Sequence, residues 1–549
     1  MNARYADLIL VNALLWRSRE DAAPRPNRAL AVSGDRIVRL GDASDILELR
    51  GPATEMIDLG GSLLLPGFRD AHLHPMIGAI DLVECRLSGP ADAVSYLAQL
   101  RDYAGKHPDS PFIRGSGWIY AAFPKTGPRR EQLDGIVPDR PVFLKAIDGH
   151  TGWVNSAALQ LAGITRETPD PAGGVIERDP ATGEPTGFLR EWPAMGMVTG
   201  KLPKPGIDEY LEGARLFLAQ AAKFGITAVH DAVGKPPFIA AWERLDELDE
   251  LTLHVTASQF GNPEAGPEHI AELLEIRNRW KSPRRKIGAA KISLDGVVEG
   301  RTALLLDPYA DAPGCFGEAM WEAADVRRFV VDLDAAGFQT HFHAVGDAAV
   351  RLALDALEAA RKANGLRDGR HMIAHADLVH PADLPRFARL GVVANLQPAW
   401  YYHDSNFDGV ALPCLGQERA FRQFELRILR DAGTRFAFSS DWPFGGDALT
   451  FNPLDGIETA ITRRGTGKTN TPPFVPDQSV DLVTMLDGFT RGPAFVDFDD
   501  DAGTIAVGNR ADLTALDRDL FSIPAAEIHE ARVRLTVAAG RVTWRESRL

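Results

Sequence analysis

Eight short apolar segments recur along the middle of this 549-residue chain and alternate with segments of helical patterning. Buried strands that alternate with helices favour a parallel sheet, and eight such units fit a (β/α)8 barrel. We therefore predict an α/β fold with a TIM-like barrel, in which helices such as Asp347 to Arg361 follow the later strands. The predicted strands are 63–68, 226–230, 251–256, 289–294, 339–343, 372–375, 392–396 and 436–440.

The two ends of the chain resemble each other, because each contains short β-rich runs separated by glycine-containing turns. These runs lie at 6–11 and 31–38 near the N-terminus, and at 509–516 and 534–544 near the C-terminus. Such patterns are hairpin signals, and two or three short strands are too few to bury a face alone. We predict that the two ends pair in one composite β-sandwich domain.

A turn-rich stretch between Cys85 and Pro205 interrupts the alternation. It contains one more strand-like run, Pro141 to Leu144, which would make nine barrel strands if it were counted. We therefore predict a large insertion after the first barrel strand that covers the active-site face. The predicted parts are 1–62 (sandwich, N-terminal part), 63–84 (first barrel strand and metal motif), 85–205 (insertion), 206–497 (remaining barrel) and 498–549 (sandwich, C-terminal part).

Composition excludes several classes of protein. The chain is 45% hydrophobic and 25% charged, as in globular proteins with a large core. Its net charge of −15 and the lack of a basic run argue against nucleic acid as a partner. The three cysteines form no CxxC pair, and no segment has the length of a membrane span or a signal peptide. We expect a cytoplasmic protein with no membrane partner, and a homodimer from the size class of the barrel.

Histidines follow three of the predicted strands. His72 and His74 are two residues apart, so on an extended segment both side chains point to the same side. His343 and His375 each end a short apolar run. Alone, each is more often a core or loop histidine than a ligand, but together they lie at the catalytic rim of a barrel. Imidazole is a preferred zinc ligand, so we predict one or two divalent ions, with zinc as the expected metal.

Two further residues complete the predicted site. Asp441 follows the last strand, where a carboxylate can bind metal and accept a proton from water, although single Asp residues there are often helix caps. Lys291 lies within an apolar strand, where a lysine is costly unless it is paired, neutral or modified. The sequence leaves two explanations open: a salt bridge to a buried carboxylate, or carbamylation by CO2, which gives an anionic metal ligand.

The order HxH, strand lysine, His, His and Asp resembles the amidohydrolase superfamily. More closely, the chain is similar to its amidohydrolase-3 branch of YtcJ-like proteins, which includes N-substituted formamide deformylase. The resemblance covers essentially the whole chain and is specific as an ordered set. The matching phrases are LPGFRDAHLH at 65–74, GSGW at 115–118, DGHTGWVNSAAL at 148–159, PTGFLRE at 185–191, KISLDG at 291–296, HAVGDAAV at 343–350 and SSDWP at 439–443.

This resemblance implies a barrel with a composite β-sandwich, a divalent metal centre and hydrolysis of an amide or related C–N bond in a small molecule. It assigns metal binding to His72, His74, Lys291 (often carbamylated), His343, His375 and Asp441, and Asp441 is also the expected catalytic residue. Substrate contacts are expected from family motifs and from an aromatic residue. These substrate-binding candidates are Trp118, His150, Asn155, Arg301 and Gln397.

Two other functions remain open at this stage. The superfamily also contains deaminases with a single metal ion, usually without a carbamylated lysine. A catalytically silent binding or regulatory protein is the third alternative, although the intact set of ligands argues against it.

Overall fold

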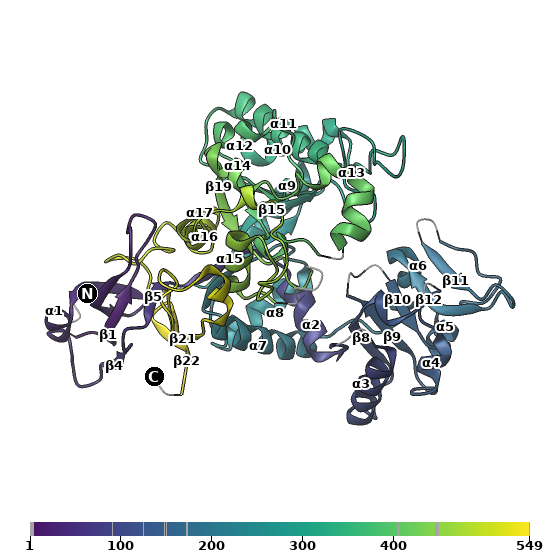
Figure 1. Cartoon of the computed structure of the whole chain (residues 1–549), viewed down its shortest axis with the longest axis horizontal. Coiled ribbons are helices and arrows are strands. Elements are labelled where there is room, and N and C mark those ends of the chain that lie inside the picture. The colour runs from purple at the N-terminus through teal and green to yellow at the C-terminus, as the bar shows by residue number, and fades with distance from the viewer. Residues whose placement is uncertain are drawn as a thin grey trace. The chain divides into compact units, whose positions relative to one another are not determined.

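The computed structural model describes residues 5–89, 92–124, 126–147, 149, 151–171, 174–404, 406–444, 450–547 and 549. The chain divides into two compact units (Figure 1). The first unit comprises Met1–His74, Leu218–Trp442 and Thr450–Leu549 and contains the barrel and a terminal sheet. The second unit comprises Pro75–Phe217 and Pro443–Leu449.

Eight parallel strands form the barrel, and each is hydrogen-bonded to the next in chain order from first to last. The first and last segments also meet: the amide of Asp441 donates to the carbonyl of His72 at 2.8 Å, and the amide of His74 to the carbonyl of Trp442 at 2.7 Å. The predicted TIM-like barrel is confirmed. Its strands are β6 (Phe68–Leu73), β13 (Ile226–Asp231), β14 (His254–Phe260), β15 (Arg285–Ser293), β16 (Gln339–Ala344), β17 (Met372–His375), β18 (Val393–Leu396) and β19 (Arg435–Phe438).

Helices follow the barrel strands, as the alternating pattern predicted. In α11 the buried residues Val350, Leu354 and Leu357 recur at helical spacing and turn one apolar face inward. The longer loop after β18 contains a helix of its own. The helices after the strands are α8 (Pro236–Glu247), α9 (Pro267–Arg279), α10 (Ala323–Ala335), α11 (Asp347–Asn364), α12 (Leu384–Leu390), α13 (Leu412–Ala420), α14 (Leu426–Asp431), α15 (Pro453–Thr462), α16 (Leu482–Gly488) and α17 (Arg491–Val496).

Both chain ends contribute to one eight-stranded sheet, which lies in the same unit as the barrel. Strand β5 joins the two ends, because it pairs parallel to β1 and antiparallel to β20. Leu10, Leu64 and Val537 share one buried apolar cluster of this sheet. The prediction that both termini build a second, β-rich part is confirmed. Its strands are β1 (Leu8–Leu15), β2 (Arg25–Ser33), β3 (Arg36–Asp42), β4 (Glu55–Asp58), β5 (Leu63–Pro66), β20 (Leu513–Leu516), β21 (Val533–Ala538) and β22 (Arg541–Arg545), and α1 (Ala43–Leu47) follows β3.

The passage from the terminal sheet into the barrel differs from the sequence prediction. The run 63–68 was predicted as one barrel strand, but Leu63–Pro66 belongs to the terminal sheet and the barrel strand begins at Phe68. Gly67 separates them. A Cβ at this glycine would lie 2.4 Å from the Thr227 side chain, so only glycine fits where the chain crosses β13. Apolar runs alone do not distinguish the two sheets, because both bury such residues.

The second unit has its own six-stranded sheet. Strand β9, which contains the extra strand-like run of the sequence, pairs with β8 and β10 in this sheet and not with the barrel. Trp118, Leu144 and Trp153 belong to its apolar core. The elements are α2 (Pro75–Val83), β7 (Cys85–Arg86), α3 (Ala93–Lys106), β8 (Ile113–Trp118), α4 (Arg130–Asp134), β9 (Val142–Ala146), β10 (Thr151–Val154), α5 (Ser156–Ala162), β11 (Val175–Arg178), β12 (Pro185–Arg190) and α6 (Glu191–Thr199), while α7 (Ile207–Lys223) leads into the first unit.

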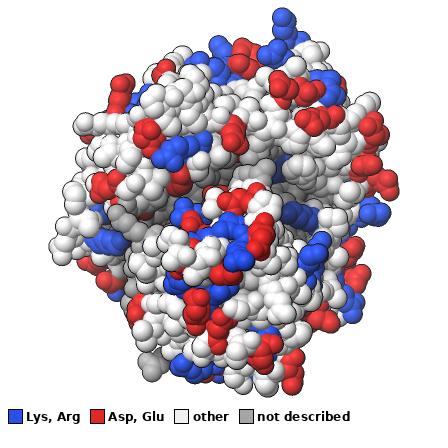
Figure 2. Space-filling model, turned by 90° about the vertical axis from the view of Figure 1, so that its right-hand side faces the viewer, with Lys and Arg blue, Asp and Glu red and all other residues white. Residues whose placement is uncertain are grey.

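Surface charges are mixed on the face drawn in Figure 2, where acidic and basic side chains are interspersed among uncharged ones. Within the described part of the chain, none of the helices combines the length and the apolar character that a membrane crossing needs.

Candidate metal centre

The six residues predicted as ligands all lie at the carboxyl ends of barrel strands. His72 is near the end of β6 and His74 follows it, Lys291 is in the last third of β15, and His343 and His375 are near or at the ends of β16 and β17. Asp441 follows β19. Because parallel strands end at one rim, side chains far apart in the sequence meet there.

Five of the six residues are connected by short distances around the Asp441 carboxylate. Its Oδ1 atom lies 3.1 Å from Nε2 of His72 and 3.1 Å from Nε2 of His74. The ligand atoms of His72, His375 and Asp441 all lie within 4.8 Å of one another. The rings of His343 and His375 are 4.4 Å apart between centroids. The structure therefore gathers nitrogen and oxygen donors of the kind that bind zinc.

Lys291 is the sixth residue and is 4% exposed. Its Nζ atom lies 3.3 Å from Nε2 of His72. Among the described residues no carboxylate oxygen lies within 4 Å of this amine, so the salt bridge considered from the sequence is not formed there. Burial lowers the pKa of Lys291 to about 7.

Hydrogen bonds orient the imidazoles. Nδ1 of His375 lies 3.0 Å from Oε1 of Gln397, an acceptor, so Nδ1 carries the proton and Nε2 keeps its lone pair. Nε2 of His343 donates to the carbonyl of Gly296 at 3.1 Å, which leaves Nδ1 as the donor atom to a metal. Burial also lowers the pKa values of these histidines, for His343 to about 3 and for His375 well below the ordinary value. Neutral imidazole is the form that binds metal.

Two backbone positions at the site are strained. His375 and Asp441 adopt left-handed conformations, with φ of 73° and 57°. For residues other than glycine such conformations cost about 1–3 kcal/mol each and concentrate at functional sites. Two of them among six predicted ligands indicate that the fold holds these side chains in place for a function.

The donor set fits a divalent cation. Asp441 Oδ1 is buried and has no hydrogen-bond partner among the described residues, although an imidazole nitrogen of His72 and one of His74 each lie 3.1 Å away. A buried carboxylate oxygen without a hydrogen bond is costly, and a cation between the carboxylate and the two lone pairs removes that cost.

The predicted substrate contacts lie in different surroundings. Trp118 is buried in the second unit and its Nε1 donates to the carbonyl of Leu144 at 2.8 Å. Asn155 caps helix α5 by accepting from the amide of Ala158. Arg301 forms an ion pair with Asp311 at 2.5 Å.

Two substrate candidates remain. Gln397 is buried and contacts His375, as described above, so its observed contact is with a predicted ligand. His150 lies outside the described residues.

Several buried polar residues of the barrel escaped the sequence analysis. His341 is fully buried and lies 2.8 Å from His72 through Nε2 and Nδ1. His230 and Ser258 are also fully buried in the barrel strands. The available signal was a polar residue inside a predicted apolar strand, and for His341 a second HxH pair with His343.

The sequence profile of the Amidohydrolase family matches residues 55–544. The chain belongs to this family. The predicted resemblance and the expected identity as an amidohydrolase are thus confirmed. A protein of Bacillus subtilis (strain 168) named as amidohydrolase YtcJ is 31% identical over 512 residues, which covers 90% of this chain and 92% of the relative.

Two further comparisons support the same family. The N-substituted formamide deformylase of Arthrobacter pascens is 28% identical over 556 residues and covers 97% of both chains. A crystal structure described as an uncharacterized metal-dependent hydrolase from Pyrococcus furiosus has a TM-score of 0.73 at 26% identity and covers 93% of this chain and 99% of that chain. The fold is therefore shared along nearly the whole chain.

Proposed function

We propose that this amidohydrolase hydrolyses a C–N bond of a small organic amide, such as an N-substituted formamide, at a divalent metal centre with zinc as the expected ion. The observation that carries the proposal is the buried Asp441 oxygen between two imidazole nitrogens at 3.1 Å. The choice of substrate class rests on the relative that is named as a formamide deformylase.

A divalent ion at this centre supplies Lewis-acid chemistry, which polarises a carbonyl and makes water a better nucleophile near neutral pH. Asp441 accepts the proton of the attacking water as the water oxygen bonds to the carbonyl carbon. It then gives this proton to the leaving nitrogen as the C–N bond breaks, so the products are an amine and a carboxylic acid. The carboxylate therefore acts first as a base and then as an acid.

For Lys291 we propose carbamylation. A buried neutral amine is nucleophilic and can add CO2 with the loss of one proton, which gives an anionic carbamate with two oxygens. The absence of a described carboxylate within 4 Å and the pKa of about 7 support this reaction. Such a carbamate would join His343 and His375 as an anionic oxygen ligand for divalent metal.

A deaminase with one metal ion is the second candidate, and one observation favours it. The donor atoms of His72, His375 and Asp441 lie within 4.8 Å of one another, which is the spacing of ligands around a single ion. The number of ions per chain therefore separates the two functions.

Metal content is the first test. Elemental analysis should find about two ions per chain in the wild-type protein and fewer in Lys291→Ala. Lys362→Ala is the control, because Lys362 is an exposed lysine in the last turn of α11, outside the set of predicted ligands. One ion per chain, unchanged in Lys291→Ala, would favour the deaminase. No metal in the wild type would favour a binding or regulatory protein.

Turnover is the second test. A panel of N-substituted formamides and simple amides should contain a substrate, and Asp441→Asn should lower kcat on it by about 10²–10⁴-fold, the usual contribution of a general acid–base. Circular dichroism and thermal unfolding establish that the variant folds. Wild-type turnover in a folded Asp441→Asn protein is incompatible with the proposed role of this carboxylate.

A further inference from the structure

We propose that Asp497 sets the tautomer of His72 through a chain of hydrogen bonds across the barrel interior, so that the Nε2 lone pair of His72 faces the metal centre. Asp497, His230, Ser258 and His341 are thereby positioning residues. The inference rests on the proposed metal-dependent function, because it assigns these residues a role toward a metal ligand.

The hydrogen-bond chain links four barrel strands to the residue that follows helix α17. Nδ1 of His72 lies 2.8 Å from Nε2 of His341, and Nδ1 of His341 lies 3.0 Å from Oγ of Ser258. The same hydroxyl lies 2.8 Å from Nε2 of His230, whose Nδ1 lies 2.8 Å from Oδ1 of Asp497. The four inner side chains are fully buried, and Asp497 is 2% exposed.

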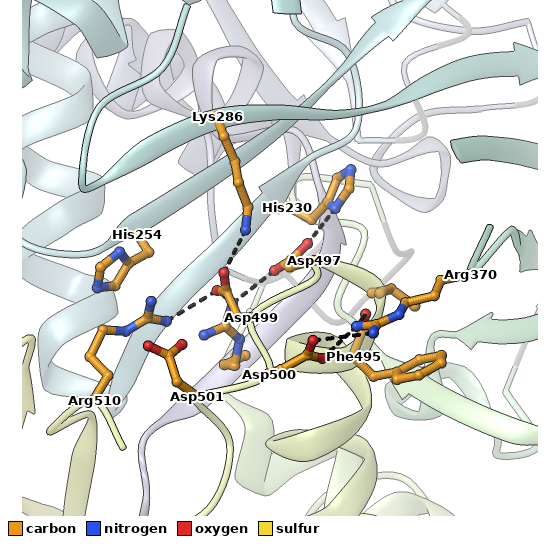
Figure 3. A network of polar contacts seen from close by, with 12 residues as sticks. His230, His254, Lys286, Arg370, Phe495, Asp497, Asp499, Asp500, Asp501 and Arg510 are labelled. Atoms are coloured by element: carbon orange, nitrogen blue, oxygen red, sulfur yellow. Dashed lines mark hydrogen bonds and ion pairs between the residues drawn. The ribbon is translucent and has the colours of Figure 1, made fainter. Parts of the chain in front are cut away.

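Asp497, at one end of this series of hydrogen bonds, lies in a cluster of charged side chains (Figure 3). Arg69 donates to Oδ2 of Asp497 at 2.9 Å and also bonds to Asp499. Asp499 in turn accepts from Lys286 and from Arg510. Burial alone would raise the pKa of Asp497, but its contacts with His230 and Arg69 hold the pKa below the ordinary value. Asp497 is therefore an ionised carboxylate, which only accepts hydrogen bonds.

The charges around Asp497 balance without a charge on His230. The carboxylates of the cluster are those of Asp497, Asp499 and Asp512, and its cations are Arg69, Arg510 and Lys286. Three negative charges meet three positive ones, so a cationic imidazole would add an unbalanced charge to a buried region. Nε2 of His341 and Nδ1 of His72 face each other at 2.8 Å, a contact in which one nitrogen donates and the other accepts a single proton.

The direction of every hydrogen bond now follows. Because Asp497 only accepts, Nδ1 of His230 carries the proton and its Nε2 must accept from Ser258. The hydroxyl has one proton, so it accepts from Nδ1 of His341. Nε2 of His341 then accepts from Nδ1 of His72. The one proton of the His72 ring is therefore on Nδ1, and Nε2, which lies 3.1 Å from Asp441, presents its lone pair to a metal ion.

Asp497→Asn should reverse the donor and acceptor roles in every hydrogen bond between Asp497 and His72. Arg69 can only donate, so it takes the amide oxygen and leaves the amide NH2 facing Nδ1 of His230. That nitrogen must then accept, which moves the proton to Nε2 and turns each later hydrogen bond around. His72 would end with its proton on Nε2, where it blocks metal binding. Substitutions of residues that orient a metal ligand typically cost about 10–100-fold in metal affinity, and we expect a loss of this size.

Ser258→Ala interrupts the chain and provides the decisive comparison. Without the Ser258 hydroxyl, a change of hydrogen-bond direction at Asp497 and His230 is not passed on to His341 and His72. Asp497→Asn should therefore weaken zinc binding by about 10–100-fold in the wild-type background but by less than about twofold in Ser258→Ala. A purely structural role of Asp497 predicts equal losses in both backgrounds, and this result would overturn the inference.

Asp499→Asn is the matched control. It disturbs the same cluster through Arg69, Lys286 and Arg510 but does not touch His230. It should lower the unfolding temperature while leaving the zinc Kd of the folded protein within about twofold of the wild type. An equal loss of zinc affinity in Asp499→Asn and Asp497→Asn would assign the effect to stability and reject the hydrogen-bond chain.

Nitrogen NMR of the metal-free protein, with 15N-labelled histidine, reads the tautomers without a metal or a substrate. Signals of His72, His230 and His341 are assigned by single His→Gln variants. The wild type should show Nδ1–H for all three rings and Asp497→Asn should show Nε2–H. If the wild type binds no zinc, the proposed function fails, yet this spectrum still tests the inference. Unchanged tautomers in Asp497→Asn would refute it.

Discussion

Gln397 offers a test of how the site is organised, because the sequence assigns it to the substrate and the structure places it against the predicted ligand His375. Its Oε1 accepts from Nδ1 of His375 at 3.0 Å, and its Nε2 donates to Oγ of Ser439 at 2.8 Å and to the carbonyl of Asn395 at 3.2 Å. We predict that Gln397→Leu, which fills a similar volume without the acceptor, weakens metal binding.

The size of the effect follows from the two states of the protein. With metal bound, His375 must keep its proton on Nδ1, and in Gln397→Leu that buried donor has no acceptor. An unsatisfied buried donor costs about 1–3 kcal/mol. Without metal the ring can move its proton to Nε2, so the cost falls on the bound state alone. Since 1.4 kcal/mol is a factor of ten, metal affinity should fall about 5–150-fold.

The assay is a competition titration with a zinc chelator, with kcat and KM measured at saturating zinc. Gln397→Glu is the matched variant: its carboxylate still accepts from Nδ1, so metal affinity should be retained. If Gln397→Leu instead keeps the wild-type zinc Kd and raises KM alone, the glutamine contacts substrate and the orienting role is wrong.

Three further predictions concern stability and metal. Removal of the metal by a chelator should lower the unfolding temperature. The decrease in unfolding temperature should grow with the logarithm of the zinc concentration before removal, as expected for an ion that binds only the folded state. An unfolding temperature independent of zinc would contradict a bound ion. Burial lowers the pKa of His254 to about 4, whereas in the unfolded chain this histidine has a pKa of about 6.5. As the pH falls below about 6.5, the unfolded state therefore binds a proton that the folded state does not. The free energy of unfolding decreases, by up to about 3 kcal/mol at pH 4. Urea unfolding at pH 7 and pH 5 should therefore show a smaller difference in His254→Gln than in the wild type. Gly67→Ala places a Cβ 2.4 Å from Thr227, so it should destabilise the protein by about 1–3 kcal/mol in urea unfolding, and Gly67→Ala with Thr227→Ser should recover part of this loss.

The barrel could be predicted from the sequence because its strands are apolar and alternate with helical segments, but the ends of the strands could not. Leu63–Pro66 is as apolar as a barrel strand and lies in the terminal sheet. The third strand was expected at 251–256 and lies at His254–Phe260, where Thr256, Ser258 and Gln259 are buried. Buried polar residues interrupt the apolar pattern of a strand. In a barrel with hydrogen-bonded polar side chains in its interior, the strand ends therefore cannot be located from the apolar pattern alone.

The ligands could be proposed because HxH and the strand lysine are unusual in their places, whereas the residues that orient them carry no local signal. Ser258 and Gln397 look like ordinary strand and loop residues in the sequence, and only the fold brings them to His341 and His375. Asp497 is 425 residues after His72, and four hydrogen bonds connect them. Such partners follow from three-dimensional geometry alone.

Two barrel strands carry a residue of the charge cluster near one end and a predicted ligand near the other. Strand β6 carries Arg69 of the charge cluster near its start and the predicted ligand His72 near its end, and β15 likewise carries Lys286 near its start and Lys291 five residues later. Damage to the cluster that only loosens the barrel should lower stability and leave the zinc Kd of the folded protein nearly unchanged, as expected for Asp499→Asn. Asp497→Asn is expected to lower the zinc affinity of the folded protein as well, and this additional loss measures what the tautomer of His72 contributes.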